Sequence, residues 1–258
     1  MVGVVVGAAA LAVVLLMAIT ALAARRTGRW AVVDVTWGLG FLVVTVIAVL
    51  LGDGDVLRRG ILLGLAAAWS LRLASHILRR SGGREDPRYE ELKQQGKGGF
   101  VRRVLLPQGL AIFFVSLPIQ VAVASHRPVG WLAWVGVAIW LVGLAFESIG
   151  DAQLKQFKAG PANKGKVMDR GLWAFTRHPN YFGDACVWWG IYLVAADSGL
   201  AGAATVLSPV AMTYFLVFAT GARLLEKTMM QRDGYPEYAE RTSMFFPLPP
   251  KRQGTRRS

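Results

Sequence analysis

The sequence has one cysteine, three histidines and few charged residues, and each shortage argues against a class of protein or site. With Cys186 as the only cysteine, a disulfide-stabilised secreted scaffold is excluded. His76, His126 and His178 are scattered and none has a partner at metal-ligand spacing, which predicts that there is no metal site. Charged residues make up only 17% of the chain, fewer than an ordinary soluble domain carries.

Apolar residues are abundant instead. They make up 54% of the 258 residues, and the mean hydropathy is +0.42, which is typical of a polytopic membrane protein. The formal net charge of +13 could also indicate nucleic-acid binding. However, the basic residues lie in loops between apolar runs, as they do in cytoplasmic membrane loops. We therefore expect a lipid bilayer around the chain and no nucleic-acid partner.

Seven apolar segments have about the length that a bilayer requires. They cover residues 2–24, 31–51, 58–78, 104–124, 130–150, 181–197 and 201–225, of which the sixth is the shortest. The first segment has no basic region before it, and its arginines follow the apolar run, so we interpret it as a retained spanning helix and not a signal peptide. We expect an all-α polytopic membrane protein with about seven transmembrane helices, built as one helical domain over residues 1–250.

The connecting loops alternate in charge. Loops 25–30, 79–103 and 151–178, together with the chain from residue 227, hold nearly all the lysines and arginines, whereas Arg58 and Arg59 are exceptions. By the positive-inside rule, the N-terminus is expected outside and the C-terminus in the cytoplasm. We expect the basic tail, residues 251–258, to be disordered beside anionic lipid. The glycine-rich loop 81–103 matches no phosphate-loop pattern and is predicted to be a flexible linker or a mobile lid.

Two spanning segments carry ionisable residues, which are expensive in a membrane and usually functional. Trp30, Asp34, Trp37 and Phe41 share one helical face, so one carboxyl lies on an aromatic surface that would suit a flat apolar ligand with one polar group. The alternative is an interfacial aromatic belt in which Asp34 pairs with a loop arginine.

Arg72 presents the second case. It shares a helical face with Trp69 and His76, where it could contact a ligand. The alternative is that Arg72 extends to the cytoplasmic surface two turns away.

Residues 177–190 form the most informative stretch. Pro179 fits the first position of a helix, and the N–H groups at such a start, with two cationic side chains just before it, bind anions well. The residues that we expect to contact a cofactor here are Arg177, His178, Asn180, Tyr181, Asp184 and Trp188.

Mixed charge recurs at the cytoplasmic ends of the fifth and seventh segments. The residues are Glu147, Asp151, Lys155, Arg223, Glu226 and Lys227. They could be a solvated interface with ion pairs between neighbouring turns. Because they converge with the stretch 177–190 at one level, we expect instead one polar, mostly basic cavity that opens to the cytosol and holds a phosphate-bearing cofactor.

Five stretches carry a resemblance to a known family. They are 34–41, 69–76, 83–89, 176–184 (Thr-Arg-His-Pro-Asn-Tyr-Phe-Gly-Asp) and 235–242 leading to Phe246-Pro247. Together they resemble the membrane-bound steroid 5-alpha-reductase-like family, in its poorly characterised bacterial branch, over most of the chain. The resemblance implies seven membrane helices in a bacterial inner membrane. It also implies that NADPH reduces a carbon–carbon double bond conjugated to a ketone in a lipophilic, steroid- or isoprenoid-like substrate.

The resemblance also implies roles for individual residues. Asp34 pairs with the family's catalytic glutamate, one methylene shorter, and Trp69 lines up with the tyrosine that polarises the ketone. Lys166 stands where the family has an arginine, and Lys227 where it has a histidine. The implied cofactor contacts are Asp151, Lys166, Asn180, Asp184, Trp188, Arg223, Lys227 and Arg241. The substrate contacts that we expect are Trp69, from this alignment, and Trp37, Phe41 and Arg72, from the helical faces described above.

Two other functions remain open. The Arg-His-Pro-x-Tyr pattern also occurs in membrane methyltransferases of the isoprenylcysteine and phospholipid type, which bind S-adenosylmethionine. Those usually carry two adjacent glutamates on the last helix, where this chain has Glu226-Lys227. A transporter or non-catalytic lipid-binding protein is the third possibility, although no inverted repeat is evident. The sequence leaves the oligomeric state open.

Overall fold

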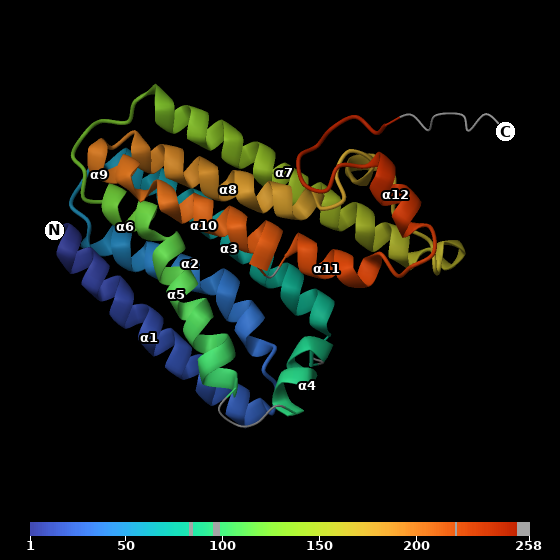
Figure 1. The fold of residues 1–258 in the computed structure, drawn as a ribbon. Helices are drawn as coiled ribbons and strands as arrows, with labels where there is room; N and C mark the ends of the chain where they lie inside the picture. The colour runs from blue at the N-terminus through green and yellow to red at the C-terminus, as the bar shows by residue number, and fades with distance from the viewer. Residues whose placement is uncertain (83–84, 95–98, 220, 252–258) are drawn as a thin grey trace. The chain divides into compact units, whose positions relative to one another are not determined.

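The computed structural model describes residues 1–82, 85–94, 99–219 and 221–251, and these residues are helical nearly throughout (Figure 1). The extended pairing found among them is one isolated parallel bridge, between Thr176 and Ser243. The helices, in chain order, are α1 Val2–Thr27, α2 Val32–Leu51, α3 Val56–Ser81, α4 Pro87–Gln94, η1 Val101–Leu105, α5 Leu106–Val115, α6 Leu117–Ala122, α7 Trp131–Ala159, η2 Pro161–Asn163, η3 Gly171–Ala174, α8 Pro179–Ala196, α9 Leu200–Ala203, η4 Ala204–Val206, α10 Leu207–Tyr214, η5 Phe215–Ala219, α11 Ala222–Met229 and α12 Tyr235–Arg241.

Six helical stretches among the described residues are long and apolar enough to cross a bilayer: Val2–Thr27, Val32–Leu51, Val56–Ser81, Val101–Ala122, Trp131–Ala159 and Leu200–Met229. They confirm the all-helical membrane fold, and the protein is an integral membrane protein with multiple spans. The remaining segment expected from the sequence forms α8, which is helical but shorter and carries polar residues at its start.

The chain divides into two compact units. Unit 1 comprises Met1–Val137 and Ile191–Ser208, and unit 2 comprises Ala138–Gly190 and Pro209–Ser258. The division falls within α7, α8 and α10, so these helices contribute to both units. That the chain folds as one domain over residues 1–250 stays a prediction.

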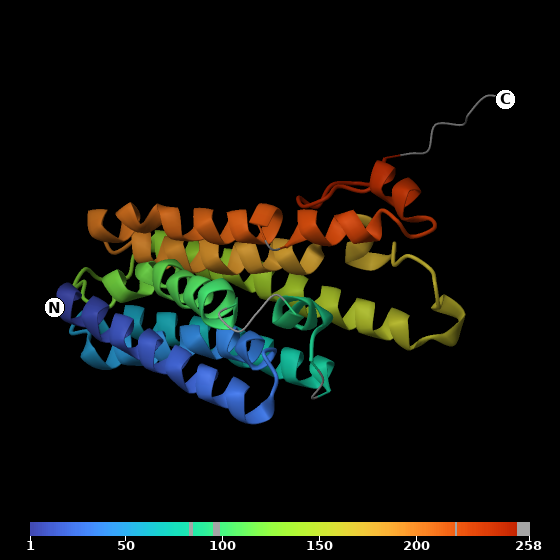
Figure 2. The same ribbon diagram turned by 60° about the horizontal axis from the view of Figure 1, so that its bottom comes forward.

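Unit 1 is a helical bundle in which α2 packs against both α1 and α3 (Figures 1 and 2). Its fourth apolar stretch is interrupted at Pro118, which has no N–H to donate to the carbonyl of Phe114. The Ser208 hydroxyl donates to that carbonyl instead, at 2.8 Å. Gln120 donates to the Phe113 carbonyl at 2.9 Å and to the Ser116 hydroxyl at 2.8 Å. Side chains therefore satisfy the backbone where proline breaks a helix inside the membrane.

Arg58 and Arg59, the exceptions to the loop charge pattern, make structural contacts in unit 1. Arg58 is fully buried, donates to the Val194 carbonyl at 2.7 Å and pairs with the Asp197 carboxylate at 3.0 Å. Arg59 donates to the carbonyls of Val49 and Gly52 at 3.2 and 2.7 Å. Both side chains satisfy acceptors on neighbouring segments, which explains why two arginines occur at the start of α3, where the charge rule expects few.

Unit 2 packs Ala185, Val217 and Phe245 into a small core. Its helices α7 and α8 cross at two glycines. A Cβ added at Gly143 would lie 2.5 Å from the Gly183 carbonyl oxygen, and one at Gly183 would lie 2.5 Å from the Gly143 oxygen. Only two glycines allow the backbones to approach this closely, so Gly183 in the stretch 176–184 is explained by helix packing.

We expect Gly183→Ala to lower the free energy of unfolding by about 1–3 kcal/mol, because the new methyl group meets backbone atoms that cannot move aside. Gly64→Ala on α3 is the matched control, since a Cβ there meets nothing within 4 Å. Thermal unfolding in detergent micelles measures both. Equal melting temperatures for the two variants would contradict this account of the crossing.

Two expectations fall wholly or partly outside the described residues. In the loop 81–103, residues 83–84 and 95–98 lie outside them, and α4 occupies the part between. In the tail 251–258, residues 252–258 lie outside them as well. The orientation of the chain in the membrane stays a prediction.

Candidate functional site

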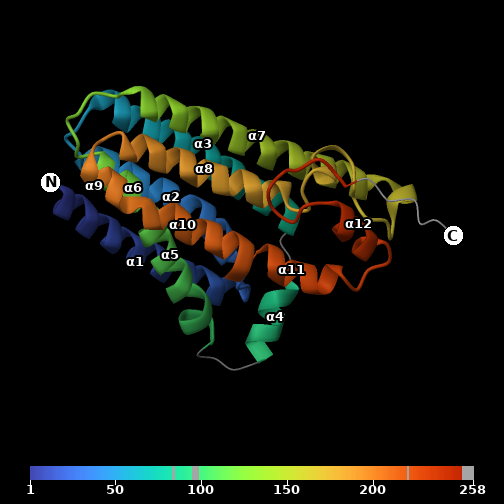
Figure 3. The ribbon, with the colours of Figure 1, turned by 45° about the horizontal axis from the view of Figure 1, so that its top comes forward.

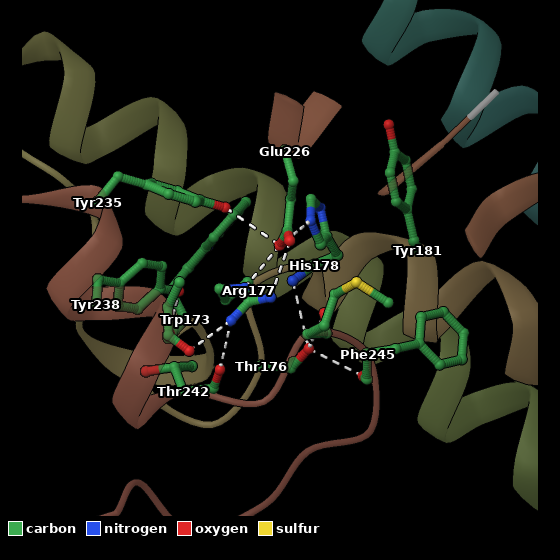
Figure 4. A network of polar contacts seen from close by, with 12 residues as sticks. Trp173, Thr176, Arg177, His178, Tyr181, Glu226, Tyr235, Tyr238, Thr242 and Phe245 are labelled. Atoms are coloured by element: carbon green, nitrogen blue, oxygen red, sulfur yellow. Dashed lines mark hydrogen bonds and ion pairs between the residues drawn. The ribbon is translucent and has the colours of Figure 1, made fainter. Parts of the chain in front are cut away.

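Glu226 on α11 is the centre of a polar network in unit 2 (Figure 4). The Arg177 guanidinium donates to both of its carboxylate oxygens, at 2.6 and 2.8 Å. The His178 ring lies 3.1 Å from one of these oxygens, and the Tyr235 hydroxyl donates to it at 3.4 Å. The Arg177 and Glu226 side chains are only 10% and 12% exposed, so this is a nearly buried, two-point ion pair.

The same arginine fastens the C-terminal segment. Its guanidinium also donates to the carbonyls of Ala239 and Thr242, at 2.6 and 2.9 Å. Thr176 donates to the Phe245 carbonyl at 2.9 Å, and the Tyr238 hydroxyl donates to the Trp173 carbonyl at 2.5 Å (Figure 4). Arg177 and its neighbours thus join the residues before α8 to those around α12. Figure 3 shows where these two chain segments run in unit 2.

Two buried phenols belong to this region. Burial raises the pKa of Tyr235, and the neighbouring Glu226 carboxylate raises it further. Burial likewise raises the pKa of Tyr238, helped by the nearby Tyr235. Both phenols therefore stay protonated at neutral pH and act as hydrogen-bond donors.

The predicted cofactor residues in unit 2 differ in how far they are already engaged. Arg177 and His178 contact Glu226, so both side chains are already engaged within the protein. Arg241 pairs closely with Asp169. Among the predicted cofactor residues of unit 2, the exposed cations are Lys166, Arg223 and Lys227, of which Arg223 lies 4.4 Å above the ring of Phe218.

The predicted contacts on α7 and α8 lie close to one another. A Cβ on Gly150 would meet Pro179 at 3.1 Å, so the α7 turn that carries Asp151 lies against the start of α8, which carries Asn180. Tyr181 stacks on the His178 ring at 5.3 Å between centroids. On the next two turns of α8, Asp184 and Trp188 are buried.

Unit 2 also has an open cavity of about 280 Å³, whose lining includes none of the predicted cofactor residues. Its walls come from the end of α7 and from the loop that follows. They are lined by Gln153, Gln156, Phe157, Asn163, Met168, Arg170 and Gly171. Two of its three amides are engaged within the protein, since Asn163 donates to the Phe157 carbonyl at 2.9 Å and Gln153 accepts from the Leu172 N–H at 3.0 Å.

In unit 1 the predicted catalytic residue, Asp34, has a partner that was not expected. The Tyr89 hydroxyl on α4 donates to its carboxylate at 2.6 Å. Arg88 lies 3.6 Å from the second oxygen but bonds mainly to Asp86, at 2.9 and 3.0 Å. Burial, and then the Asp34 carboxyl, raises the pKa of Tyr89, so this phenol keeps its proton at neutral pH.

The predicted aromatic surface divides into two parts. Trp37, Phe41 and Trp69 form an edge-on series with ring centroids 5.1 and 5.5 Å apart, and Phe41 and Trp69 are fully buried. Trp30 precedes α2 and stacks on Phe100 instead, at 4.8 Å. The series is therefore a packed core beneath Asp34, and the proposed contact of these rings with substrate stays a prediction.

The remaining predicted substrate contact, Arg72, lies half-buried on α3 within unit 1. Its contact with substrate stays a prediction as well. No group of three or more His, Cys, Asp and Glu side chains that could hold a metal ion occurs within the described ranges.

Sequence reasoning missed Tyr89 as the partner of Asp34. The two residues are 55 positions apart, and alignment with the reductase family points to Trp69 for the phenol. The available signal was the matching stretch 83–89, which ends on Tyr89. The role of Glu226 as the acceptor for Arg177 and His178 was also missed, because no local spacing links residues 48 or 49 positions apart.

Comparisons with known proteins give one family and one named relative. The model of a family described as "Protein of unknown function (DUF1295)" matches residues 20–242. A protein of Ustilaginoidea virens named "Probable O-methyltransferase ustE" is 40% identical over 65 residues. This match covers 25% of the chain and 22% of the relative, so the chain spans under a quarter of that protein. No solved structure matches the chain.

Proposed function

The chain belongs to the DUF1295 family, and we propose that it is a membrane-embedded enzyme that uses NADPH to reduce a carbon–carbon double bond conjugated to a carbonyl. The substrate is a lipophilic molecule that reaches unit 1 from the bilayer. The observation that carries the proposal is the 2.6 Å hydrogen bond between Tyr89 and Asp34 at the start of a spanning helix.

A carboxyl and a phenol in contact suit this reaction. When an enone accepts hydride at its β-carbon, negative charge builds on the carbonyl oxygen, and a hydrogen-bond donor in a dry site stabilises that charge. Tyr89 keeps its proton at neutral pH and donates to one oxygen of Asp34, and in the reaction Asp34 takes up a proton from solvent and donates it through the oxygen that Tyr89 does not use. The pair thus hands one proton to the oxygen, and the enol then tautomerises to the saturated ketone.

The residues of unit 2 fit a phosphate-bearing dinucleotide. Lys166, Arg223 and Lys227 present exposed positive charge, and Arg170 at the amide-lined cavity adds another guanidinium. NADPH, when bound, supplies the hydride. Arg177 supports the site indirectly, because its guanidinium is already engaged with Glu226 and two backbone carbonyls.

A second candidate is an S-adenosylmethionine-dependent O-methyltransferase. The relative of Ustilaginoidea virens favours it by its name, and the Arg-His-Pro-x-Tyr stretch is the pattern that this chain shares with such enzymes, although Lys227 stands where they usually carry a second glutamate. The Tyr89–Asp34 pair would then act as a general base that takes the proton of a hydroxyl or carboxyl group before methyl transfer. Both candidates use an adenosine-containing donor, so the donor discriminates between them.

Donor binding to the purified protein in detergent tests the proposal. We expect NADPH to bind with quenching of tryptophan fluorescence. Arg223→Ala or Lys227→Ala should weaken binding about tenfold, which corresponds to about 1.4 kcal/mol. Arg232→Ala, another exposed arginine of unit 2, is the control that should leave binding unchanged. Binding of S-adenosylmethionine without binding of NADPH would replace the reductase by the methyltransferase.

A further inference from the structure

Helix α4 is fastened to the start of α2 by one carboxylate. Glu85 accepts from the backbone N–H groups of Trp30 and Ala31, at 2.7 and 2.8 Å, one with each oxygen. These N–H groups lie where α2 begins and have no partner in the helix itself, and a negative charge is favoured there by the helix dipole. Glu85 therefore caps the start of α2, and it lies two residues before the first residue of α4.

The other end of α4 returns to the same place. The Lys93 ammonium lies 2.5 Å from the Glu85 carboxylate and donates to the Gly28 carbonyl at 2.9 Å. Gly28 ends α1, so the contact ties α4 to the turn between α1 and α2. Burial would raise the pKa of Glu85, but its bonds with Lys93 and with the two N–H groups lower the pKa below its usual value. The carboxylate is therefore charged at neutral pH and is lost only in acid.

Tyr89 lies midway between these two attachments, four residues after Glu85 and four residues before Lys93. Tyr89 and Lys93 share one face of α4, because four residues make about one turn. The phenol ring packs among Val33, Phe100 and Leu105, and its hydroxyl donates to Asp34 in the first turn of α2. The cap on α2 thus sets the distance between Tyr89 and the helix that carries Asp34.

We infer that Glu85 and Lys93 form a clamp that positions the Tyr89 phenol on Asp34. They are positioning residues. Their effect on turnover rests on the proposed function, in which the Tyr89–Asp34 pair transfers a proton to the substrate. The clamp is a property of α1, α2 and α4, so it can be tested without turnover.

The test is a titration of the tyrosines, followed by ¹⁹F NMR of protein labelled with 3-fluorotyrosine. The chain has six tyrosines, and Tyr89→Phe assigns the resonance of Tyr89. The charged groups facing Tyr89 are Asp34 on α2 together with Asp86 and Arg88 at the start of α4, while Arg80 from the end of α3 acts on Asp86. We expect Tyr89 in the wild type to titrate well above the usual range of a phenol.

In Glu85→Gln and in Lys93→Met, the pKa of Tyr89 is expected to fall toward the usual range of a phenol, and kcat is expected to fall about tenfold with an unchanged KM. Lys93→Arg keeps the charge and should restore both values. Glu91→Gln, an exposed residue on the same helix, is the matched control. Tyr89 titration unchanged in both clamp variants would overturn the clamp. Full activity of Tyr89→Phe with NADPH would instead overturn the proposed function and leave the clamp standing.

Discussion

Tyr89→Phe is expected to lower kcat about 100-fold while NADPH binds as it does to the wild type. The variant loses one hydroxyl whose proton stays in place at neutral pH, since burial and Asp34 raise its pKa. The ring itself remains packed among Val33, Phe100 and Leu105, so the fold should persist. Stopped-flow measurement of NADPH oxidation with a 3-oxo-4-ene steroid or an isoprenoid enone as probe gives kcat, and fluorescence gives the affinity.

Tyr214→Phe is the matched control for this result. Tyr214 is 55% exposed on α10 and stacks on Phe218, so removal of its hydroxyl should change neither rate nor affinity. Asp34→Asn should lower kcat as far as Tyr89→Phe does, and the double variant should be no slower, because residues that act as one unit are not additive. Additive losses in the double variant would show that the two residues act independently.

Glu226→Gln should destabilise unit 2 by about 3 kcal/mol, the loss expected when one partner of a buried ion pair is removed. The amide leaves the Arg177 guanidinium, which is 10% exposed, without a countercharge. Since Arg177 also donates to the carbonyls of Ala239 and Thr242, the C-terminal segment should loosen first. Thermal unfolding in micelles and hydrogen exchange of residues 235–248 measure the two effects.

Glu237→Gln makes the same chemical change at an exposed residue of α12 and should leave stability within about 0.5 kcal/mol. The double variant Arg177→Met/Glu226→Met should lose less stability than the sum of the two single variants, because neither charge is then buried alone. Losses that add would show that Glu226 and Arg177 contribute separately and that no ion pair holds the segment.

The spanning helices could be predicted because membrane insertion depends on a property of local sequence, the length of an apolar run. The predicted segment 31–51 became α2 Val32–Leu51, and 201–225 lies within the span Leu200–Met229. Helix α8 was predicted by the same rule, although its polar start shortens the apolar part. Backbone hydrogen bonds must be satisfied within the membrane, so an apolar run of this length has few alternatives to a helix.

The polar contacts could not be predicted in the same way. Asp34 was recognised because a carboxyl is rare within an apolar run, but its partner Tyr89 comes from a short helix outside the spans. The Arg177 stretch was recognised as unusual and was assigned to an anion, whereas the structure places Glu226 against the guanidinium. Composition reveals where a charge is expensive, but the group that compensates it is set by tertiary packing.

The cofactor contacts predicted from the resemblance stay predictions, because they belong to unit 2 and the Tyr89–Asp34 pair belongs to unit 1. Their common role depends on which donor the protein uses. The group that is transferred to the substrate, hydride or methyl, identifies the donor most directly. The transfer can be detected without knowledge of the natural substrate.

The decisive measurement follows two labels in parallel into the lipid fraction. Protein in liposomes of bacterial lipid extract receives NADPH deuterated at the hydride position or S-adenosylmethionine with a ¹³C-methyl group, and mass spectrometry detects the label in the lipids. The account predicts a lipid product that has gained one deuterium and one hydrogen across a double bond, with no transferred methyl group. Asp34→Asn should not form this product. Transfer of ¹³C-methyl without deuterium would contradict the reductase and establish a methyltransferase.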